Sequence, residues 1–228
     1  MNDGVSLPTS SPATSVAMIR TLGGIAMISG LLVVLVYQVT LPIITENQRR
    51  AVERAVFEVI PGAVSRTDFV LGPTGLTHLE EEQASQAVTL HAGYDASGEL
   101  RGVALQAAAR GYQDVIKILY GYDPLCECIT GIHVLKMTET PGLGDKIAKD
   151  PEFLANFKAL DAKLNAQKTA LSHRIVAVKH GTKTEPWQID GISGATISSK
   201  AIGRMLNDSA QEMFPKIAQH LDKLHVSN

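Results

Sequence analysis

A stretch of small and hydroxylated residues near the C-terminus has the composition of an anion-binding loop. It runs from Asp190 to Ser199 with the sequence DGISGATISS, and a helical pattern follows it at once. Small residues let another molecule approach the backbone closely, and a helix N-terminus favours a phosphate through its free N–H groups and its dipole. The hydroxyl of Thr196 would stand at that terminus. The same pattern is typical of a glycine turn with a Ser or Thr helix cap, and this stretch alone leaves both interpretations open.

A second glycine-rich segment, Glu139 to Gly144, lies about fifty residues upstream. Loops on a rigid scaffold tend to carry binding residues, so the two segments are candidates for one site. Neither matches the phosphate loop or the spaced glycines of a dinucleotide fold, and the chain has no His-Glu-x-x-His motif. Ser193 stands between Gly191 and Ala195 rather than in Gly-x-Ser-x-Gly, which argues against a hydrolase. The chain therefore presents binding loops without an evident acid–base constellation.

The two cysteines, Cys126 and Cys128, are separated by one residue. On a strand their Cα atoms would lie about 6.6 Å apart, near the upper limit for a disulfide. Two thiols also fall short of the four ligands of a structural zinc or an iron–sulfur cluster, even with His133 nearby. The sequence therefore predicts unpaired thiols in a strand.

Composition separates a membrane segment from the rest of the chain. The formal net charge of the 228 residues is −2, which gives no electrostatic case for nucleic-acid binding. No charged residue occurs from Thr21 to Thr45, and about 20 apolar residues span the hydrocarbon core of a bilayer. The run is too long for the apolar region of a signal peptide, and no small-residue cleavage site follows it. It predicts one transmembrane helix.

The charges that flank this helix point to one orientation without deciding it. Arg20 precedes the helix, whereas Arg49, Arg50 and Arg54 follow it, interleaved with glutamates. A count of Lys and Arg would place the large domain in the cytoplasm, by a small margin.

The remaining pattern predicts an α+β domain with helices packed on an antiparallel sheet. Residues 46–62 form a stalk helix that Pro61-Gly62 ends. Strands are predicted over 67–71, 87–92, 101–106, 114–120, 128–137 and 171–179. Helices are predicted over about 145–167 and about 198–224, the second with a kink or break at Pro215. The resulting division is a disordered tail over 1–19, a transmembrane helix over 20–45, the stalk over 46–62 and the domain over 63–228.

Two motifs carry a resemblance to a known family. The segment from Ser193 to Ser199, SGATISS, resembles the attachment motif of the FMN-binding domain family, and the segment from Glu139 to Ile147, ETPGLGDKI, resembles its second signature. Both occur in the family's order and spacing behind one membrane helix, and the similarity covers about residues 20–225. Within this family the chain resembles the G subunit of the Rnf ion-translocating electron transport complex. That protein is related to the C subunit of the sodium-translocating NADH:quinone oxidoreductase.

The resemblance implies a role for each matching residue. Thr196 would be esterified through its hydroxyl to the phosphate of FMN by a magnesium-dependent flavin transferase that takes FMN from FAD. A threonine hydroxyl is a poor nucleophile without a base or a metal, which agrees with attachment by a separate enzyme. Thr140 and Leu143 would contact the ring or the ribityl chain, and Glu139 would be a hydrogen-bond acceptor or a structural cap. The other expected cofactor-binding residues are Gly142, Gly144, Ser193, Gly194, Ala195, Ile197 and Ser198.

Several neighbours have more than one interpretation. The hydroxyls of Ser198 and Ser199 are expected to stabilise the phosphodiester at the helix N-terminus. Lys200 would add charge there or be a solvated surface lysine. Trp187 would approach the flavin ring or pack in the core. Asp145 and Lys146 would be helix-start surface charges or ligands.

The resemblance also implies the function. The chain would be an electron-carrier subunit of an ion-translocating oxidoreductase, with no catalysis of its own, in a complex that couples electron flow between NADH and ferredoxin to ion movement. Its partners would be the other membrane and peripheral subunits and the flavin transferase. The alternatives are the C subunit of the sodium-translocating NADH:quinone oxidoreductase and a membrane-anchored flavin sensor or regulatory module. Family resemblance puts the protein in the bacterial inner membrane as a single-pass protein with its FMN domain on the periplasmic side, against the arginine count.

Overall fold

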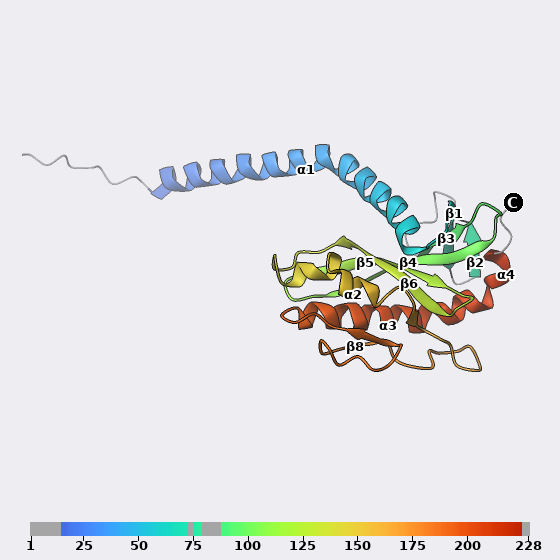
Figure 1. Cartoon of the computed structure of the whole chain (residues 1–228). Coiled ribbons are helices and arrows are strands. Elements are labelled where there is room, and N and C mark those ends of the chain that lie inside the picture. The colour runs from blue at the N-terminus through green and yellow to red at the C-terminus, as the bar shows by residue number, and fades with distance from the viewer. Residues whose placement is uncertain (1–14, 73–74, 79–87, 225–228) are drawn as a thin grey trace, which may run out of the picture. The chain divides into compact units, whose positions relative to one another are not determined.

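The computed structural model describes residues 15–72, 75–78 and 88–224, and the chain divides into two compact units, residues 1–48 and 49–228. Helix α1 (Ser15–Val59) supplies the first unit and, in its last turns, the start of the second (Figure 1). Within the described residues it is the one helix long and apolar enough to cross a membrane, with a mean hydropathy of 2.2. Residues 1–14 of the predicted disordered tail lie outside the described residues.

The second unit is built on a seven-stranded antiparallel sheet with the strand order β2-β1-β3-β4-β5-β6-β7. Its strands are β1 (Ser65–Gly72), β2 (Gly75–His78), β3 (Val88–Tyr94), β4 (Leu100–Arg110), β5 (Val115–Asp123), β6 (Cys128–Lys136) and β7 (Leu160–Asp161). Two short parallel strands, β8 (Val176–Val178) and β9 (Gln188–Asp190), form a separate pair. The predicted α+β class with an antiparallel sheet is confirmed.

Alternation along the central strands gives the sheet two buried faces. Val103 and Leu105 on β4 belong to the main core, whereas Ala104 between them packs with the last turns of α1. On β5, Leu119 likewise faces α1, and Ile118 faces the main core. Because successive side chains of a strand point to opposite faces, both faces are covered, one by α1 and one by α3.

Helix α3 (Thr196–Gln219) lies between the large sheet and the β8–β9 pair (Figure 1). This position explains why residues on more than one of its sides are buried. At Gly203 an added Cβ would lie 2.8 Å from the backbone nitrogen of Ala177, so the helix approaches β8 backbone to backbone. Near its other end the rings of Phe214 and Tyr122 stack with centroids 3.6 Å apart. Of the predicted kink or break at Pro215, the break does not occur, because the helix continues through Pro215. Helix α4 (Leu221–Leu224) follows after His220.

The helix predicted over 145–167 is also wrong. A 3₁₀ turn, η1 (Gly144–Ala148), and a short helix, α2 (Pro151–Ala155), replace its first half. The carboxylate of Asp150 caps α2 by accepting from two backbone N–H groups. Beyond it Leu160, Ala162 and Leu164 are buried at every second position, which is a strand period rather than a helical one. Of the strand predicted over 171–179, only β8 is a strand. Leu171 forms an isolated β-bridge with Leu164.

Cys126 and Cys128 form a disulfide, so the prediction of unpaired thiols is wrong. Cys126 lies in the turn between β5 and β6 instead of on a strand, and Glu127 between the cysteines is left-handed, with a φ of 51°. This turn brings the two Cα atoms to 5.2 Å, within the usual range for a disulfide. The prediction was wrong because it assumed that both cysteines lie in one strand, whereas only Cys128 does.

The end of α1 meets β5 and β6 through close backbone contact. The hydroxyl of Thr130 donates to the carbonyl of Val59 at 2.5 Å. A Cβ on Gly121 would clash with that same carbonyl oxygen and would lie 2.6 Å from Thr130 Oγ1. Glycine at position 121 is therefore required for the helix to dock on the sheet.

We predict that Gly121→Ala lowers the free energy of unfolding of the soluble domain by about 1–3 kcal/mol, because backbone and not a flexible side chain must move. Urea unfolding of the full-length protein in detergent measures this loss. Gly72→Ala is the matched control, because no heavy atom lies within 4 Å of a Cβ built there. Equal effects of the two substitutions would contradict the packing argument.

A hydrogen-bonded pair, His91 and Asp68, links β3 to β1. His91, which is buried, lies 2.7 Å from Asp68 through its Nδ1 atom, and Arg66 lies 3.5 Å from the same carboxylate. Burial alone would raise the pKa of Asp68, but the hydrogen bond and charge of His91 and the charge of Arg66 lower it below its ordinary value. This stabilisation is therefore complete above the unfolded-state pKa and is lost as the pH falls through the lower folded-state pKa.

We predict that the melting temperature of the wild-type domain falls below about pH 4. In Asp68→Asn the melting temperature should depend less on pH in this acid range. Melting temperatures of the two proteins over an acid pH series test it. Asp222→Asn, which changes a carboxylate on α4, should show the same pH dependence of the melting temperature as the wild type. If Asp68→Asn keeps the wild-type pH dependence, Asp68 is not the source of the stability lost at acid pH.

Candidate functional site

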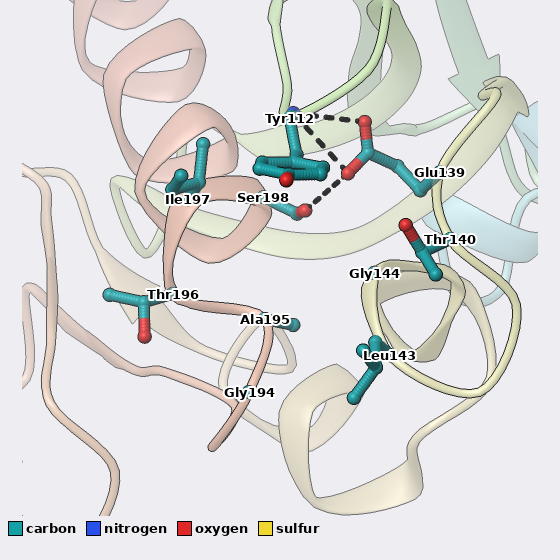
Figure 2. Close-up of a pocket in the computed structure, with 10 residues that line it drawn as sticks. All are labelled: Tyr112, Glu139, Thr140, Leu143, Gly144, Gly194, Ala195, Thr196, Ile197 and Ser198. Carbon is teal, nitrogen blue, oxygen red and sulfur yellow. Dashed lines mark hydrogen bonds between the residues drawn. The ribbon is translucent and has the colours of Figure 1, made fainter.

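A buried carboxylate joins the two glycine-rich segments that the sequence singles out. Glu139 is 8% exposed. Its Oε2 accepts a hydrogen bond of 2.6 Å from the hydroxyl of Ser198, in the first turn of α3. Its Oε1 accepts from the backbone nitrogen of Tyr112 at 3.0 Å in the β4–β5 loop (Figure 2). The same atom accepts from the backbone nitrogen of Gln113 at 3.3 Å. Glu139 thus accepts hydrogen bonds from the protein itself and ties three chain segments together.

Glycines on both sides of this carboxylate make room for it. A Cβ on Gly144 would lie 2.8 Å from Glu139 Oε2 and 3.1 Å from Ser198 Oγ, and one on Gly111 would clash with Glu139 Oε1. Gly142 has a φ of 77°, a conformation that L side chains rarely adopt, and it lets the loop turn before η1. The glycines of this loop therefore serve both close packing and the turn.

The two loops also touch directly. A Cβ on Gly194 would lie 3.2 Å from Leu143 Cδ2, and Gly194 itself has a φ of 84°. The short turn before α3 is closed by Ala195, whose N–H donates to the carbonyl of Ile192 at 3.0 Å. The Ser199 hydroxyl accepts from the backbone nitrogen of Ile192 at 3.1 Å. The N-terminus of α3 is thereby fixed from within the protein.

A cavity of about 510 Å³ opens between the loops. Its apolar walls come partly from side chains that are half-exposed, Leu143 at 47%, Ile197 at 49% and Tyr112 at 65%. This combination of an apolar surface with a few polar groups is typical of a small-molecule site. The lining residues are Tyr112, Glu139, Thr140, Leu143, Gly144, Gly194, Ala195, Thr196, Ile197 and Ser198.

Thr196 is exposed at the first position of α3. Figure 2 shows its side chain on the far side of that turn from Glu139. It also lines a second, smaller cavity of about 190 Å³ together with Lys179, His180 and Lys200. Its hydroxyl therefore stands between an apolar cavity and a basic one, at the end of a helix whose first N–H groups have no intrahelical partner.

Most of the predicted cofactor-binding residues line these two cavities. Gly142 is the exception, since it shapes the loop without lining either cavity. Ser198 and Ser199 are both buried, and both hydroxyls make hydrogen bonds within the protein, the first to Glu139 and the second with the backbone nitrogen of Ile192. Lys200 is exposed and lines the smaller cavity.

The remaining neighbours lie away from the main cavity. Trp187 stacks on His173 with ring centroids 3.8 Å apart, so it neither approaches the main cavity nor packs in the core. Asp145 pairs with Lys149 at 3.1 Å; that hydrogen bond, opposed by burial, lowers the pKa of the Asp145 carboxyl. Lys146 lines a different small cavity of about 200 Å³. Asp145 is thus a paired, partly buried carboxylate.

Sequence reasoning missed the β4–β5 loop. Tyr112 lines the main cavity, and the Gln113 side chain donates to Thr140 Oγ1 at 3.0 Å. The loop gives only a weak signal, a glycine followed by an exposed aromatic between two strands. The role of this loop follows from its contact with Glu139. Two backbone N–H groups of the loop donate hydrogen bonds to the Glu139 carboxylate.

Comparison with known proteins identifies the class to which this fold and these loops belong. A model of the family described as the FMN-binding domain matches residues 111–211, a range that holds both glycine-rich loops and the loop of Tyr112. The C subunit of the Na⁺-translocating NADH-quinone reductase from Parabacteroides distasonis has a similar fold, with a TM-score of 0.51 and 22% identity over 77% of this chain and 83% of that one.

Relatives in sequence identify the family more closely. The G subunit of the ion-translocating oxidoreductase complex of Methanosarcina acetivorans is 32% identical over 200 residues, which cover 86% of this chain and 95% of the relative. The G subunit of the Na⁺-translocating ferredoxin:NAD⁺ oxidoreductase complex of Acetobacterium woodii is 33% identical over half of each chain. The chain belongs to the family of G subunits of ion-translocating oxidoreductase complexes. The resemblance drawn from the two motifs is confirmed, and the likeness to the quinone reductase protein shows a shared fold.

We predict that Glu139→Gln lowers the free energy of unfolding by about 1–3 kcal/mol, because the amide turns an N–H₂ group toward donors that then lack an acceptor. It should also reduce the flavin bound per chain, since the two loops separate. Chemical denaturation and flavin absorbance of the purified full-length protein measure both effects.

Glu152→Gln is the control for this substitution, because it alters an exposed carboxylate on α2. It should leave stability and flavin content at wild-type values. A Glu139→Gln protein that matches this control would show that the buried carboxylate does not hold the loops together.

Proposed function

We propose that this protein carries electrons within a membrane-bound ion-translocating oxidoreductase through FMN joined to Thr196 by a phosphoester bond. The observation that carries the proposal is the position of Thr196. Its exposed hydroxyl stands at the N-terminus of α3 between the 510 Å³ cavity and the smaller cavity, which Lys179 and Lys200 line. An isoalloxazine ring needs an apolar cavity and a phosphate needs positive charge, so the two cavities suit the two ends of FMN.

The residues that would hold FMN follow from this division. Leu143, Tyr112 and Ile197 would contact the ring, with Thr140 and the backbone at Gly194 beside the ribityl chain. Lys179 and Lys200 would face the phosphate. Bound FMN supplies the redox chemistry, and the protein supplies its position and its electrostatic surroundings.

A separate flavin transferase would make the bond. In the described part of the chain, no hydrogen bond joins Thr196 Oγ1 to a carboxylate or an imidazole, so the hydroxyl lacks a local base and would be a poor nucleophile by itself. With FAD as donor, a bond forms between Thr196 Oγ1 and the FMN phosphorus. The P–O bond to AMP breaks, the hydroxyl proton leaves, and AMP departs. The φ of 84° at Gly194 and the small Ala195 leave the hydroxyl open to that enzyme.

The FMN domain would lie on the periplasmic side of the inner membrane. The arginine count opposes this orientation, but large domains translocate despite a few flanking charges. The disulfide between Cys126 and Cys128 supports it, because disulfides persist in the periplasm and are rare in the cytosol. There the tethered domain would meet the membrane subunits of its complex, whose proximity raises its effective concentration.

We predict that the full-length protein, coexpressed with a flavin transferase, gives a fluorescent band under ultraviolet light after denaturing electrophoresis. Thr196→Ala should abolish this fluorescence, because the only proposed attachment atom is removed. Ser172→Ala is the control, since Ser172 is an exposed hydroxyl that lines neither cavity, and it should retain the fluorescence. A fluorescent Thr196→Ala band, or a wild-type band without fluorescence, would refute the attachment.

We predict that protease added to intact spheroplasts degrades the soluble domain, whereas the domain is protected in inverted membrane vesicles. A cytoplasmic marker protein should show the opposite pattern and serves as the internal control. Protection in spheroplasts with cleavage in inverted vesicles would place the domain in the cytoplasm and would leave the attachment at Thr196 untouched.

A further inference from the structure

The turn that carries the disulfide is open to solvent. Cys126 is exposed, and Leu125 beside it is 78% exposed, whereas Cys128 is only 9% exposed. One sulfur is therefore presented to a partner and the other points toward the protein. Glu127 between them keeps its left-handed conformation, with a φ of 51°, which is rare for a residue other than glycine. Exposed disulfides in strained turns are the ones that exchange with thiols.

The disulfide and the flavin site lie at opposite ends of one strand. Strand β6 begins at Cys128 and ends at Lys136, and Glu139 follows three residues later. Eight strand rises separate those ends by about 26 Å. The disulfide is thus not part of the cavity that Glu139 lines, and its chemistry is independent of the FMN attachment proposed at Thr196.

We propose that Cys126 and Cys128 form a thiol–disulfide exchange site for a thioredoxin-like protein dithiol. A thiolate of that partner attacks Cys126 Sγ, the bond between the two cysteine sulfurs breaks, and Cys128 Sγ leaves as a thiolate that takes up a proton. The second thiol of the partner then attacks the mixed disulfide and releases Cys126 as a thiol. The partner's dithiol is oxidised to a disulfide, and this chain gains two electrons and two protons.

The surroundings favour a protein dithiol over a small anionic thiol. The carboxylates of Asp123 and Glu127 flank the disulfide in sequence and would repel glutathione. The exposed Leu125 offers an apolar contact that a protein surface can bind and a small thiol cannot use. Its position is fixed, because its N–H donates to Asp123 Oδ1 at 2.8 Å.

Reduction has a defined structural consequence. The carbonyl of Glu127 accepts from Ala162 N at 3.0 Å, and its side chain accepts from Leu164 N at 3.3 Å. The left-handed turn thus holds the chain that continues from β7 at the edge of the sheet. Once the disulfide opens, Glu127 is free to leave that conformation, and the two amides lose their acceptors.

The test uses the oxidised full-length protein in detergent, treated with reduced thioredoxin, glutathione or dithiothreitol at equal thiol concentration. Alkylation and mass spectrometry then count the free cysteines with time. We expect thioredoxin to reduce the disulfide at least about tenfold faster than glutathione does. Leu125→Ser should slow thioredoxin and leave the rate with dithiothreitol unchanged. Cysteines that alkylate before reduction, a disulfide that thioredoxin does not reduce, or equal slowing by both dithiols would overturn the proposal.

Hydrogen exchange tests the structural consequence in the same samples. Exchange at the amides of Ala162 and Leu164 should rise about tenfold on reduction, while the amides of Tyr112 and Gln113 near the flavin site stay as they were. The variant with Cys126→Ser and Cys128→Ser should match the reduced protein whether or not a reductant is present. Unchanged exchange at Ala162 and Leu164 on reduction would show that the disulfide does not control this edge.

Discussion

The hydrogen bonds of the Glu139 carboxylate are the interaction on which the flavin site depends. A buried carboxylate is costly unless donors surround it, and here one hydroxyl and two backbone N–H groups from other segments supply them. The cost of leaving Glu139 unpaired therefore acts as a constraint: the signature loop, the β4–β5 loop and the first turn of α3 must meet at one point. The glycines at 111 and 144 are consequences of that meeting, because any side chain there would occupy the space of the carboxylate.

The rest of the domain holds α3 so that this meeting is possible. The helix is packed between the large sheet on one side and β8 on the other, and its first turn is fixed by Glu139 and by the bond between Ile192 and Ser199. Its N-terminus is therefore rigid, and Thr196, the one residue of the motif proposed to bear the cofactor, is left exposed at that end. A rigid helix end between an apolar and a basic cavity is suited to present a tethered flavin in a defined position.

The sequence predicted those features that local pattern determines. The long apolar helix, five of the sheet strands and both loops follow from apolar runs, alternation and glycine spacing. The features that depend on contacts between distant parts of the chain were not predicted. The segment 145–167 has the polarity of a surface helix, yet its Leu160, Ala162 and Leu164 are buried with strand period. Tyr112 and Gln113 join the site only because Glu139 reaches them across the fold. The disulfide depends on the left-handed turn at Glu127. A distance between the two cysteines calculated for an extended strand does not include this turn.

The central claim is that Thr196 bears FMN on its hydroxyl oxygen. Tandem mass spectrometry of peptides from the full-length protein, isolated from membranes that also contain the flavin transferase, tests it most directly. We expect an FMN phosphoester on the peptide that contains Thr196, with fragment ions that place it on that residue and leave Ser193, Ser198 and Ser199 unmodified. Flavin on another residue, or an unmodified Thr196 peptide from protein that still contains flavin, would contradict it.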